Sequence, residues 1–280
     1  MTQLSKDIKI GIHSLGLIGG SIYKCLAEKG FKNLYALSHN QDTISQIKTD
    51  GYFASDDISI LEDCDVIFVC TPISETINAI KEVFEINKNA IIADVASLKE
   101  NILNEIEKLD NCKFIASHPM AGTENSGFNS SFAGLFMDAN WAIIPSDKVS
   151  HEDIKLFKNL VTIMDAKVVE LNSTEHDKAV ALISHLPMLL SQSLVLTAKD
   201  NKEALLLAAS GFRDTTRLAM SNKTMAKDML QLNQNNIKTA LQEVIDHAQE
   251  LLNSDFFDNN IENIIQTRKN LYNEHGKNNL

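Results

Sequence analysis

The stretch at residues 8–21, IKIGIHSLGLIGGS, decides the fold of the N-terminal part of this chain. A short apolar strand runs into a glycine-rich turn, and an amphipathic stretch follows. This order is typical of the G-x-G-x-x-G turn, which holds a pyrophosphate at a helix N-terminus. Ser14 stands in place of the first glycine, whereas Gly16 and Gly19 keep the second and third. An ordinary glycine-rich turn is the alternative. The context of strand and helix favours a cofactor site that these three residues form with Leu15, Leu17 and Ile18.

Further apolar runs follow in the first 170 residues, and amphipathic stretches separate several of them. The expected strands cover residues 8–13, 33–37, 66–70, 90–94, 113–117, 141–144 and 167–171. Apolar strands separated by helices predict an α/β fold with a doubly wound, mostly parallel sheet of the Rossmann type. After Leu171 the apolar residues recur at helical spacing. We therefore predict a dinucleotide-binding domain at 1–171 and an all-helical domain at 172–280.

The charged residues limit the classes of partner. The formal net charge is −11, and only three of the 26 basic residues are arginine. An acidic protein lacks the basic face that nucleic acids and membrane surfaces require, so we expect neither as a partner. An anionic small-molecule substrate would need positive charge concentrated at one place.

The cysteines and the apolar windows indicate a cytoplasmic protein. Four cysteines without C-x-x-C spacing predict reduced thiols rather than a disulfide scaffold. The polar N-terminus leads directly into a strand, so no signal peptide is expected. The most apolar long window, residues 179–198, contains His185, Pro187 and several polar residues. We interpret this window as a buried helix rather than a membrane span.

The end of the second expected strand bears on the choice between NAD and NADP. NAD sites usually place Asp or Glu there for the ribose hydroxyls, but residues 31–40 contain no acid. Ser38 could bind a ribose hydroxyl or a 2′-phosphate, and His39 could add positive charge. A plain polar turn is the alternative for His39, and the cofactor is NAD or NADP.

Three loops follow the carboxyl ends of expected strands, where ligands bind on open α/β sheets. The first contains Thr71 and Pro72, the second Ser97, and the third His118. The pattern Ser97-x-x-Glu100 predicts a capping box for the following helix, which is compatible with a ligand-binding hydroxyl. His118 directly follows an apolar strand, which favours a site residue over a buried structural one.

The arginines point to an anion site in the helical part. Arg213 and Arg217 lie four residues apart, on one face of an expected helix, with Asp214 between them. Arginine binds carboxylates in a two-pronged geometry that lysine cannot reproduce. We expect Arg217 to bind an anion, whereas Arg213 is compatible with a structural pair with Asp214.

The histidines of the helical part do not indicate a metal site. His176 and His185 are nine residues apart, on opposite sides of a straight helix, and no other residues have zinc-ligand spacing. We interpret His176 as a packing or capping residue and expect Pro187 to kink the helix beside His185.

Taken together, the motifs resemble those of the prephenate/arogenate dehydrogenase family of tyrosine biosynthesis. In order, they are GLIGGS, TP, DxxSxK, HPMAGTE, EHD, SHLP and GFRDxTR. HPMAGTE and GFRDxTR are the most specific, and the resemblance extends from residue 8 to about residue 233.

The resemblance implies an oxidative decarboxylation. A cyclohexadienol carboxylate, prephenate or arogenate, would lose hydride from C4 to the nicotinamide and its ring carboxylate as CO₂. By family analogy His118 accepts the proton of the C4 hydroxyl, and Ser97 binds that hydroxyl and helps to place the nicotinamide. Arg217 would bind a substrate carboxylate, with Asp214 and Glu124 in the surrounding polar network. The family also implies a homodimer, formed through the helical domain.

Three positions depart from the family pattern. Ser38 stands where NAD-preferring members have Asp. Met188 replaces a second histidine after SHLP, and Ala226 replaces a tryptophan after the arginine motif. Positions 188 and 226 border the substrate in relatives, as His185 would, so the preference for prephenate or arogenate stays open.

Two other functions are compatible with parts of the pattern. A β-hydroxyacid dehydrogenase has the same two-domain plan, but the HPMAGTE loop argues against it. A nucleotide-binding protein without catalysis is suggested by Ser14, Met188 and Ala226. The presence of Ser97, His118 and Arg217 argues against that function.

Overall fold

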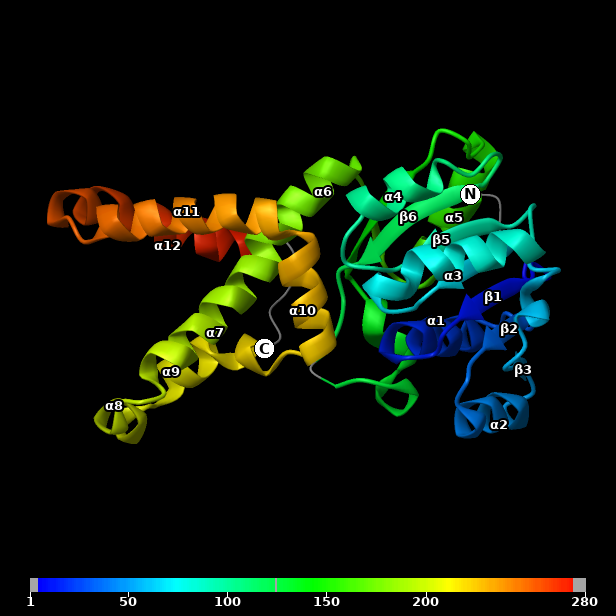
Figure 1. Cartoon of the computed structure of the whole chain (residues 1–280), viewed down its shortest axis with the longest axis horizontal. Coiled ribbons are helices and arrows are strands. Elements are labelled where there is room, and N and C mark those ends of the chain that lie inside the picture. The colour runs from blue at the N-terminus through cyan, green and yellow to red at the C-terminus, as the bar shows by residue number, and fades with distance from the viewer. Residues whose placement is uncertain (1–4, 124, 274–280) are drawn as a thin grey trace. The chain divides into compact units, whose positions relative to one another are not determined.

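The computed structural model describes residues 5–123 and 125–273, which form an eight-stranded sheet and helices (Figure 1). The strand order is β3-β2-β1-β4-β5-β6-β7-β8, and all neighbouring pairs are parallel except β6 and β7. The predicted doubly wound, mostly parallel sheet is therefore confirmed. The strands are β1 (Ile10–His13), β2 (Leu34–Leu37), β3 (Phe53–Ser55), β4 (Val66–Val69), β5 (Ile91–Asp94), β6 (Phe114–Pro119), β7 (Asn140–Pro145) and β8 (Lys167–Glu170).

One strand, β3, was missed by the sequence analysis. It has three residues, and its first side chain, Phe53, is exposed, so it offers neither a long apolar run nor a regular alternation. Its pairing with β2 is fixed by the sheet rather than by its own composition: Tyr35 lies opposite Phe53, and the two rings stack with centroids 4.8 Å apart. Such tertiary contacts are invisible in a single strand's sequence.

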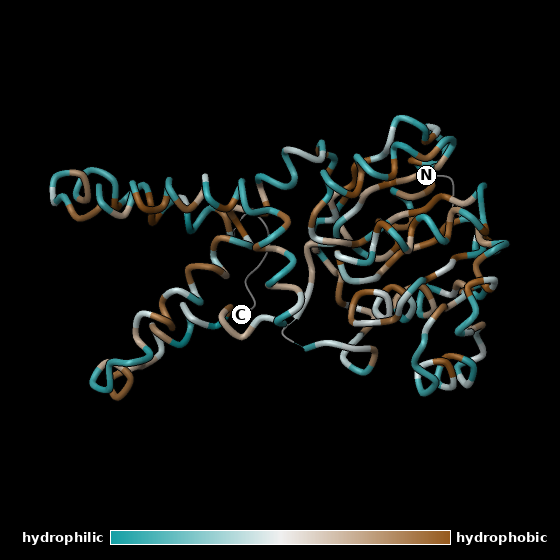
Figure 2. The backbone as a smooth tube through the Cα atoms, in the orientation of Figure 1, coloured by the Kyte–Doolittle hydropathy of each residue, from teal (hydrophilic) through white to brown (hydrophobic). Residues whose placement is uncertain are grey.

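Helices cover both faces of the sheet and create two apolar cores. Alternate strand residues point to opposite faces, so Phe68 belongs to one core and its neighbour Ile67 to the other. Figure 2 shows the strands as predominantly hydrophobic. The first core lies under α1 (Leu17–Glu28), α2 (Gln41–Thr49) and α5 (His151–Ile163), and the second under α3 (Ile73–Ile86) and α4 (Glu100–Ile106).

The chain after β8 is helical, as predicted. A π-helical segment, Ala181–His185, interrupts the first long helix directly before Pro187, where the sequence predicts a kink. Such π segments are common at functional sites. The helices are α6 (Ser173–Val180), α7 (Leu186–Ala198), α8 (Lys202–Leu207), α9 (Ser210–Thr215), α10 (Lys223–Leu232), α11 (Gln234–Leu251) and α12 (Ser254–Asn273).

By compactness the chain divides into two units, Met1–Gln234 and Asn235–Leu280. The first contains the sheet and the helices through α10, and the second contains α11 and α12. The boundary between 171 and 172 marks the end of the sheet and stays a prediction as a domain boundary. Glu124 lies outside the described residues.

The apolar stretch at Ser173–Ala198 is less buried than expected. It is long and apolar enough to cross a membrane by length and composition, and only 33% of its most apolar window is buried. Ile183 and Leu196 are 67% and 63% exposed. The expectation of a buried helix was therefore wrong for the isolated chain, because the described residues leave this face uncovered. All four cysteines are free thiols.

Candidate active site

The glycine-rich turn joins β1 to α1 at the carboxyl ends of the central strands. Ser14 has a φ of 72°, the left-handed conformation that glycine usually supplies. This conformation costs an L-residue about 1–2 kcal/mol. The amide of Ser14 donates to the carbonyl of Leu37 at 2.9 Å, which ties the turn to the end of β2. Serine thus keeps the path of the turn at an energetic cost.

Gly16 and Gly19 differ in what surrounds them. A Cβ at Gly19 would lie 2.1 Å from the carbonyl oxygen of Ser14, so the fold itself requires glycine there. A Cβ at Gly16 would meet nothing within 4 Å in the structure. Gly16 directly precedes α1, whose first amide groups have no acceptor within the helix. The open space beside Gly16 therefore fits a pyrophosphate that approaches this helix N-terminus.

This difference predicts opposite results for two alanine variants. Gly16→Ala should leave the melting temperature nearly unchanged but weaken dinucleotide binding by about tenfold or more, equivalent to about 1.4 kcal/mol. Gly19→Ala should destabilise the protein by about 3 kcal/mol, because its Cβ collides with backbone. Thermal melting and calorimetric titration with NAD⁺ and NADP⁺ measure both effects. Unchanged dinucleotide affinity in Gly16→Ala would contradict the assignment of this turn as the pyrophosphate site.

The end of β2 presents polar groups but no acid. Ser38 is buried, and its hydroxyl accepts from the amide of Asn40 at 3.2 Å. His39 is exposed beside it. His13, at the end of β1, has a buried Nδ1 without a hydrogen-bond partner among the described residues. Burial lowers the pKa of His13, and the nearby His39 lowers it further.

Thr71 and Pro72 connect β4 to α3 at the same edge of the sheet. The amide of Cys70 donates to the carbonyl of His13 at 2.8 Å, so this loop begins beside the glycine-rich turn. The hydroxyl of Thr76 donates to the carbonyl of Pro72 at 3.0 Å and lies 3.2 Å from the hydroxyl of Thr71. The loop therefore has a fixed shape next to the expected nucleotide.

A buried polar cluster at the ends of β5 and β6 was missed by the sequence analysis. Asp94 and Lys99 form an ion pair in which both side chains are fully buried. Asp94 Oδ1 accepts from the amide of Ser117 at 3.0 Å, and Lys99 Nζ donates to the carbonyl of Ser117 at 2.7 Å. Trp141 Nε1 donates to the hydroxyl of Ser117 at 3.1 Å. This cluster fixes the backbone that immediately precedes His118.

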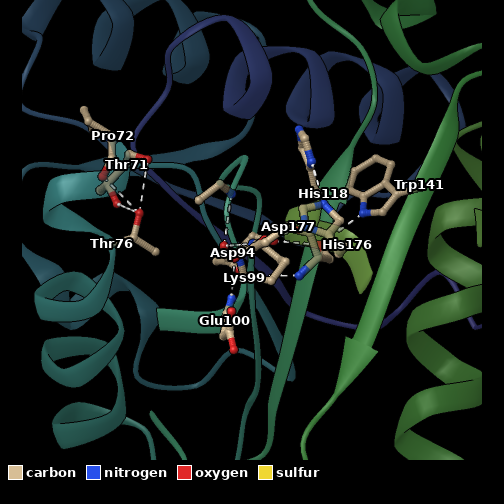
Figure 3. A network of polar contacts seen from close by, with 12 residues as sticks. Thr71, Pro72, Thr76, Asp94, Lys99, Glu100, His118, Trp141, His176 and Asp177 are labelled. Carbon is tan, nitrogen blue, oxygen red and sulfur yellow. Dashed lines mark hydrogen bonds and ion pairs between the residues drawn. The ribbon is translucent and has the colours of Figure 1, made fainter. Parts of the chain in front are cut away.

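His118 forms its side-chain contact with a residue of the helical part. Its Nδ1 lies 3.0 Å from Nε2 of His176, and Nδ1 of His176 lies 2.8 Å from Oδ1 of Asp177 (Figure 3). His176 and Asp177 are 1% and 5% exposed, whereas His118 is half-buried. The interpretation of His176 as a packing or capping residue was incomplete, because this buried imidazole also makes polar contacts with His118 and Asp177. Its signal in the sequence was the EHD motif, in which no role was given to Asp177.

Ser97 does not cap the following helix, contrary to the predicted capping box. Helix α4 begins at Glu100, and the residue before it, Lys99, makes no side-chain cap. The amides of Lys99 and Glu100 instead donate to the Asp177 carboxylate at 2.9 and 3.0 Å. A cap supplied by a distant residue cannot be seen in local spacing. The half-buried Ser97 hydroxyl forms no hydrogen bond with another described residue, so it is free to contact a ligand.

The electrostatic surroundings keep His118 neutral. Desolvation lowers its pKa well below the ordinary histidine value, and the nearby His176, Lys99 and His185 lower it further. A neutral imidazole can accept a proton, which is the role expected of a general base. Within the described residues, no group of three or more His, Cys, Asp or Glu side chains could hold a metal ion.

The arginine motif does not form one continuous α-helix. Helix α9 ends at Thr215, and a 3₁₀ turn, Arg217–Met220, follows. The expected shared face of Arg213 and Arg217 was therefore wrong. Arg213 Nε donates to Asp214 at 2.9 Å, the structural pair considered from the sequence. The exposed Arg217 guanidinium forms no ion pair or hydrogen bond with any residue in the described ranges, which leaves it available for an anion.

His185 and Met188 lie at the π segment and the start of α7. His185 is fully buried, and its Nδ1 accepts from the side-chain Nδ2 of Asn233 at 3.1 Å. Burial lowers the pKa of His185 to about 4. Met188 packs in a small apolar cluster with Ala226 and Met229. The two departures from the family pattern therefore lie together, and in each an apolar residue replaces a polar or aromatic one.

Comparisons with known proteins agree with this architecture. The family model described as prephenate dehydrogenase, nucleotide-binding domain, matches residues 22–170, and that described as prephenate dehydrogenase, dimerization domain, matches residues 172–269. Together they cover most of the chain. The chain therefore belongs to the prephenate dehydrogenase family.

Individual relatives carry the same names or closely related ones. The prephenate dehydrogenase of Bacillus subtilis is 29% identical over 250 residues, which cover 85% of this chain and 67% of that protein. The chain spans about two thirds of the length of the curated relatives it matches. The arogenate dehydrogenase of Synechocystis has a TM-score of 0.78 and 29% identity, with coverage of 96% of this chain and 99% of that one. Prephenate dehydrogenase from A. aeolicus, in complex with hydroxyphenyl propionate and NAD⁺, has a TM-score of 0.84 and 25% identity, with coverage of 98% and 99%.

Proposed function

We propose that this chain converts prephenate to 4-hydroxyphenylpyruvate and CO₂ with hydride transfer to NAD or NADP. The observation that carries the proposal is the position of His118 at the carboxyl end of β6, where Nε2 of His176 lies 3.0 Å from its Nδ1. The glycine-rich turn and the free Ser97 hydroxyl lie at the same edge of the sheet. Membership of the prephenate dehydrogenase family supports this assignment.

The glycine-rich turn would hold the dinucleotide. The open space beside Gly16 and the first amide groups of α1 fit a pyrophosphate, and the loop with Thr71 and Pro72 begins at Cys70, whose amide donates to the carbonyl of His13 before the turn. When bound, the nicotinamide would take up the hydride from C4 of the substrate.

His118 and Ser97 would handle the C4 hydroxyl. His118 accepts the hydroxyl proton while the C4–H bond breaks, so C4 becomes a carbonyl carbon. The bond from C1 to the ring carboxylate then breaks, CO₂ leaves, and its electron pair makes the ring aromatic. The resulting phenolate takes the proton back from His118. Ser97 donates to the C4 oxygen throughout, which positions C4 for hydride transfer.

Arg217 would bind a substrate carboxylate, and its loss should act mainly on KM. Arg217→Ala is expected to raise KM for prephenate by about 10- to 100-fold, because a hydrogen-bonded charge pair contributes about 1.5–3 kcal/mol. Arg213→Ala is the matched control and should change KM less than about twofold, since its exposed pair with Asp214 contributes little. Steady-state kinetics measure KM for prephenate in both variants. Equal effects of the two variants would exclude Arg217 as the carboxylate ligand.

The substrate and cofactor preferences follow from one assay. Prephenate and arogenate are each tested with NAD⁺ and NADP⁺, and kcat/KM is compared over the four combinations. Ser38, the exposed His39 and the absence of an acid at the described end of β2 favour acceptance of a 2′-phosphate. Met188, which packs against Ala226 and Met229, offers no charged group to the ammonium group of arogenate. Turnover of simple 3-hydroxy acids but of neither cyclohexadienol would contradict the proposal.

We also propose that the chain is a cytoplasmic homodimer. Exposed apolar side chains lie on both α7 and α8, among them Leu196, Leu206 and Leu207, and a second copy would cover them. Figure 2 shows hydrophobic residues along both helices. The double variant Leu206→Asp/Leu207→Asp should shift the mass measured by light scattering from dimer towards monomer. A wild-type protein that is monomeric at micromolar concentration would refute the proposed dimer.

A further inference from the structure

A continuous row of hydrogen bonds connects the N-terminus of α4 to His118. The carboxylate of Asp177 accepts hydrogen bonds from the amides of Lys99 and Glu100, and its Oδ1 also lies 2.8 Å from Nδ1 of His176. Nε2 of His176 then contacts Nδ1 of His118 at 3.0 Å. Figure 3 shows these side chains as one row beside the buried Lys99.

The donors and acceptors available in this row allow only one direction for its hydrogen bonds. A carboxylate only accepts hydrogen bonds, and Asp177 already faces two backbone donors, so Nδ1 of His176 carries a hydrogen and donates to it. In a neutral imidazole the other nitrogen is then an acceptor. Nε2 of His176 therefore accepts a hydrogen bond from Nδ1–H of His118. The remaining nitrogen of His118, Nε2, is left with a free lone pair.

We propose that His176 and Asp177 are positioning residues that lock His118 in the Nδ1–H tautomer and so present Nε2 as the proton acceptor. This inference rests on the proposed function of His118 as general base. The lock acts before substrate arrives, because all three residues are already in contact. As His118 gains a proton, its Nδ1–H becomes a stronger donor to His176, and the Asp177 carboxylate at the far end of the row compensates the charge.

A purely structural role for His176 does not account for its contacts. The Asp177 carboxylate alone accepts the two backbone amides at the N-terminus of α4, and the His176 imidazole takes no part in these hydrogen bonds. A packing role would be filled better by Phe, which has no polar atoms to desolvate at 1% exposure. His185 is not part of the row: its Nδ1 accepts from the side-chain amide of Asn233, and its buried Nε2 has no hydrogen-bond partner among the described residues.

The tautomer is measured directly, without turnover. Long-range ¹H–¹⁵N spectra of the full chain at neutral pH distinguish the two neutral forms of each histidine, and His118→Asn assigns the His118 signal. We expect Nδ1 of His118 to be protonated and Nε2 to be bare in the wild-type protein. In His176→Phe the signal should move towards the opposite tautomer. A wild-type His118 protonated on Nε2 would overturn the inference, whatever the enzyme's substrate.

Kinetics separate positioning from folding. His176→Phe should lower kcat by about 10²-fold or more, because a base held in the wrong tautomer is largely inactive. Its Kd for the dinucleotide should not change. His176→Gln, whose carboxamide has both a donor and an acceptor, should stay within about fivefold of wild type. If His176→Phe does not fold, the wild-type spectrum and the kcat of His176→Gln still test the tautomer lock. A kcat in folded His176→Phe within twofold of wild type, or equal losses in both variants, would refute the lock.

Discussion

Replacing His118 with asparagine is expected to lower kcat by about 10²- to 10⁴-fold, the usual contribution of a general base. Asparagine keeps polarity near the C4 hydroxyl but cannot take up its proton. The Kd for the dinucleotide should change little, since we propose that the glycine-rich turn rather than His118 binds the pyrophosphate. Steady-state kinetics and calorimetric titration measure the two quantities separately.

The pH dependence of the wild-type enzyme tests the same residue. Because desolvation and the neighbouring His176 and Lys99 lower the pKa of His118, its imidazole stays unprotonated at pH 6.5 and above. Because its pKa is lowered, His118 becomes protonated, and so can no longer accept a proton, only when the pH falls below this range. We therefore expect kcat/KM to remain on its plateau at pH 6.5 and to fall at lower pH.

The matched control for His118→Asn is His151→Asn. His151 is an exposed residue at the start of α5, remote in sequence and element from the candidate site. It should have wild-type kinetics. Near-normal turnover in His118→Asn, with the melting temperature of the wild type, would end the assignment of His118 as the base.

Lys99→Met is expected to have the largest effect on stability. It leaves the fully buried Asp94 carboxylate without its ammonium partner and removes the donor to the carbonyl of Ser117. Breaking one side of a buried ion pair typically costs about 3–5 kcal/mol. Trp141, the single tryptophan of the chain, donates to the same Ser117 and reports on unfolding by its fluorescence. Urea unfolding followed at this residue measures the loss.

Two variants separate the buried charge from a general effect of losing a lysine. Lys108→Met removes an exposed pair with Glu105 and should change stability by less than about 1 kcal/mol. Asp94→Asn/Lys99→Met removes both charges of this pair and should recover part of the loss. Recovery is incomplete because a carboxamide oxygen satisfies only one of the two backbone donors, Ser117 and Ala96. Equal stability of Lys99→Met and Lys108→Met would contradict the account of this pair.

The long periodic elements could be predicted from the sequence, and the context-dependent ones could not. Apolar strands such as β4 and β5 are buried on both faces, so their composition identifies them. The sequence could not predict β3, whose place depends on pairing with β2. It also could not predict the break after α9, because Thr216 leaves the helix without proline or glycine.

The sequence could predict which residues belong to the candidate site, but not which partners hold them in place. Each of Ser97, His118 and Arg217 was identified from its place after a strand or from its residue type. Their partners could not be identified in this way. Asp177 caps a helix that begins 77 residues earlier, and His176 contacts His118 across 58 residues. Contacts of this kind depend on tertiary folding: the EHD motif marked His176 and Asp177 in the sequence, but local spacing does not indicate which distant residues they contact.

The most direct test of the central claim is the stoichiometry of products formed from prephenate. Purified protein is incubated with prephenate and NAD⁺ or NADP⁺, and the reduced nicotinamide, CO₂ and 4-hydroxyphenylpyruvate are quantified together. Oxidative decarboxylation at this site predicts equal amounts of all three, and loss of all three in His118→Asn. Binding of the dinucleotide without formation of any of them, or reduced nicotinamide without CO₂, would contradict the account.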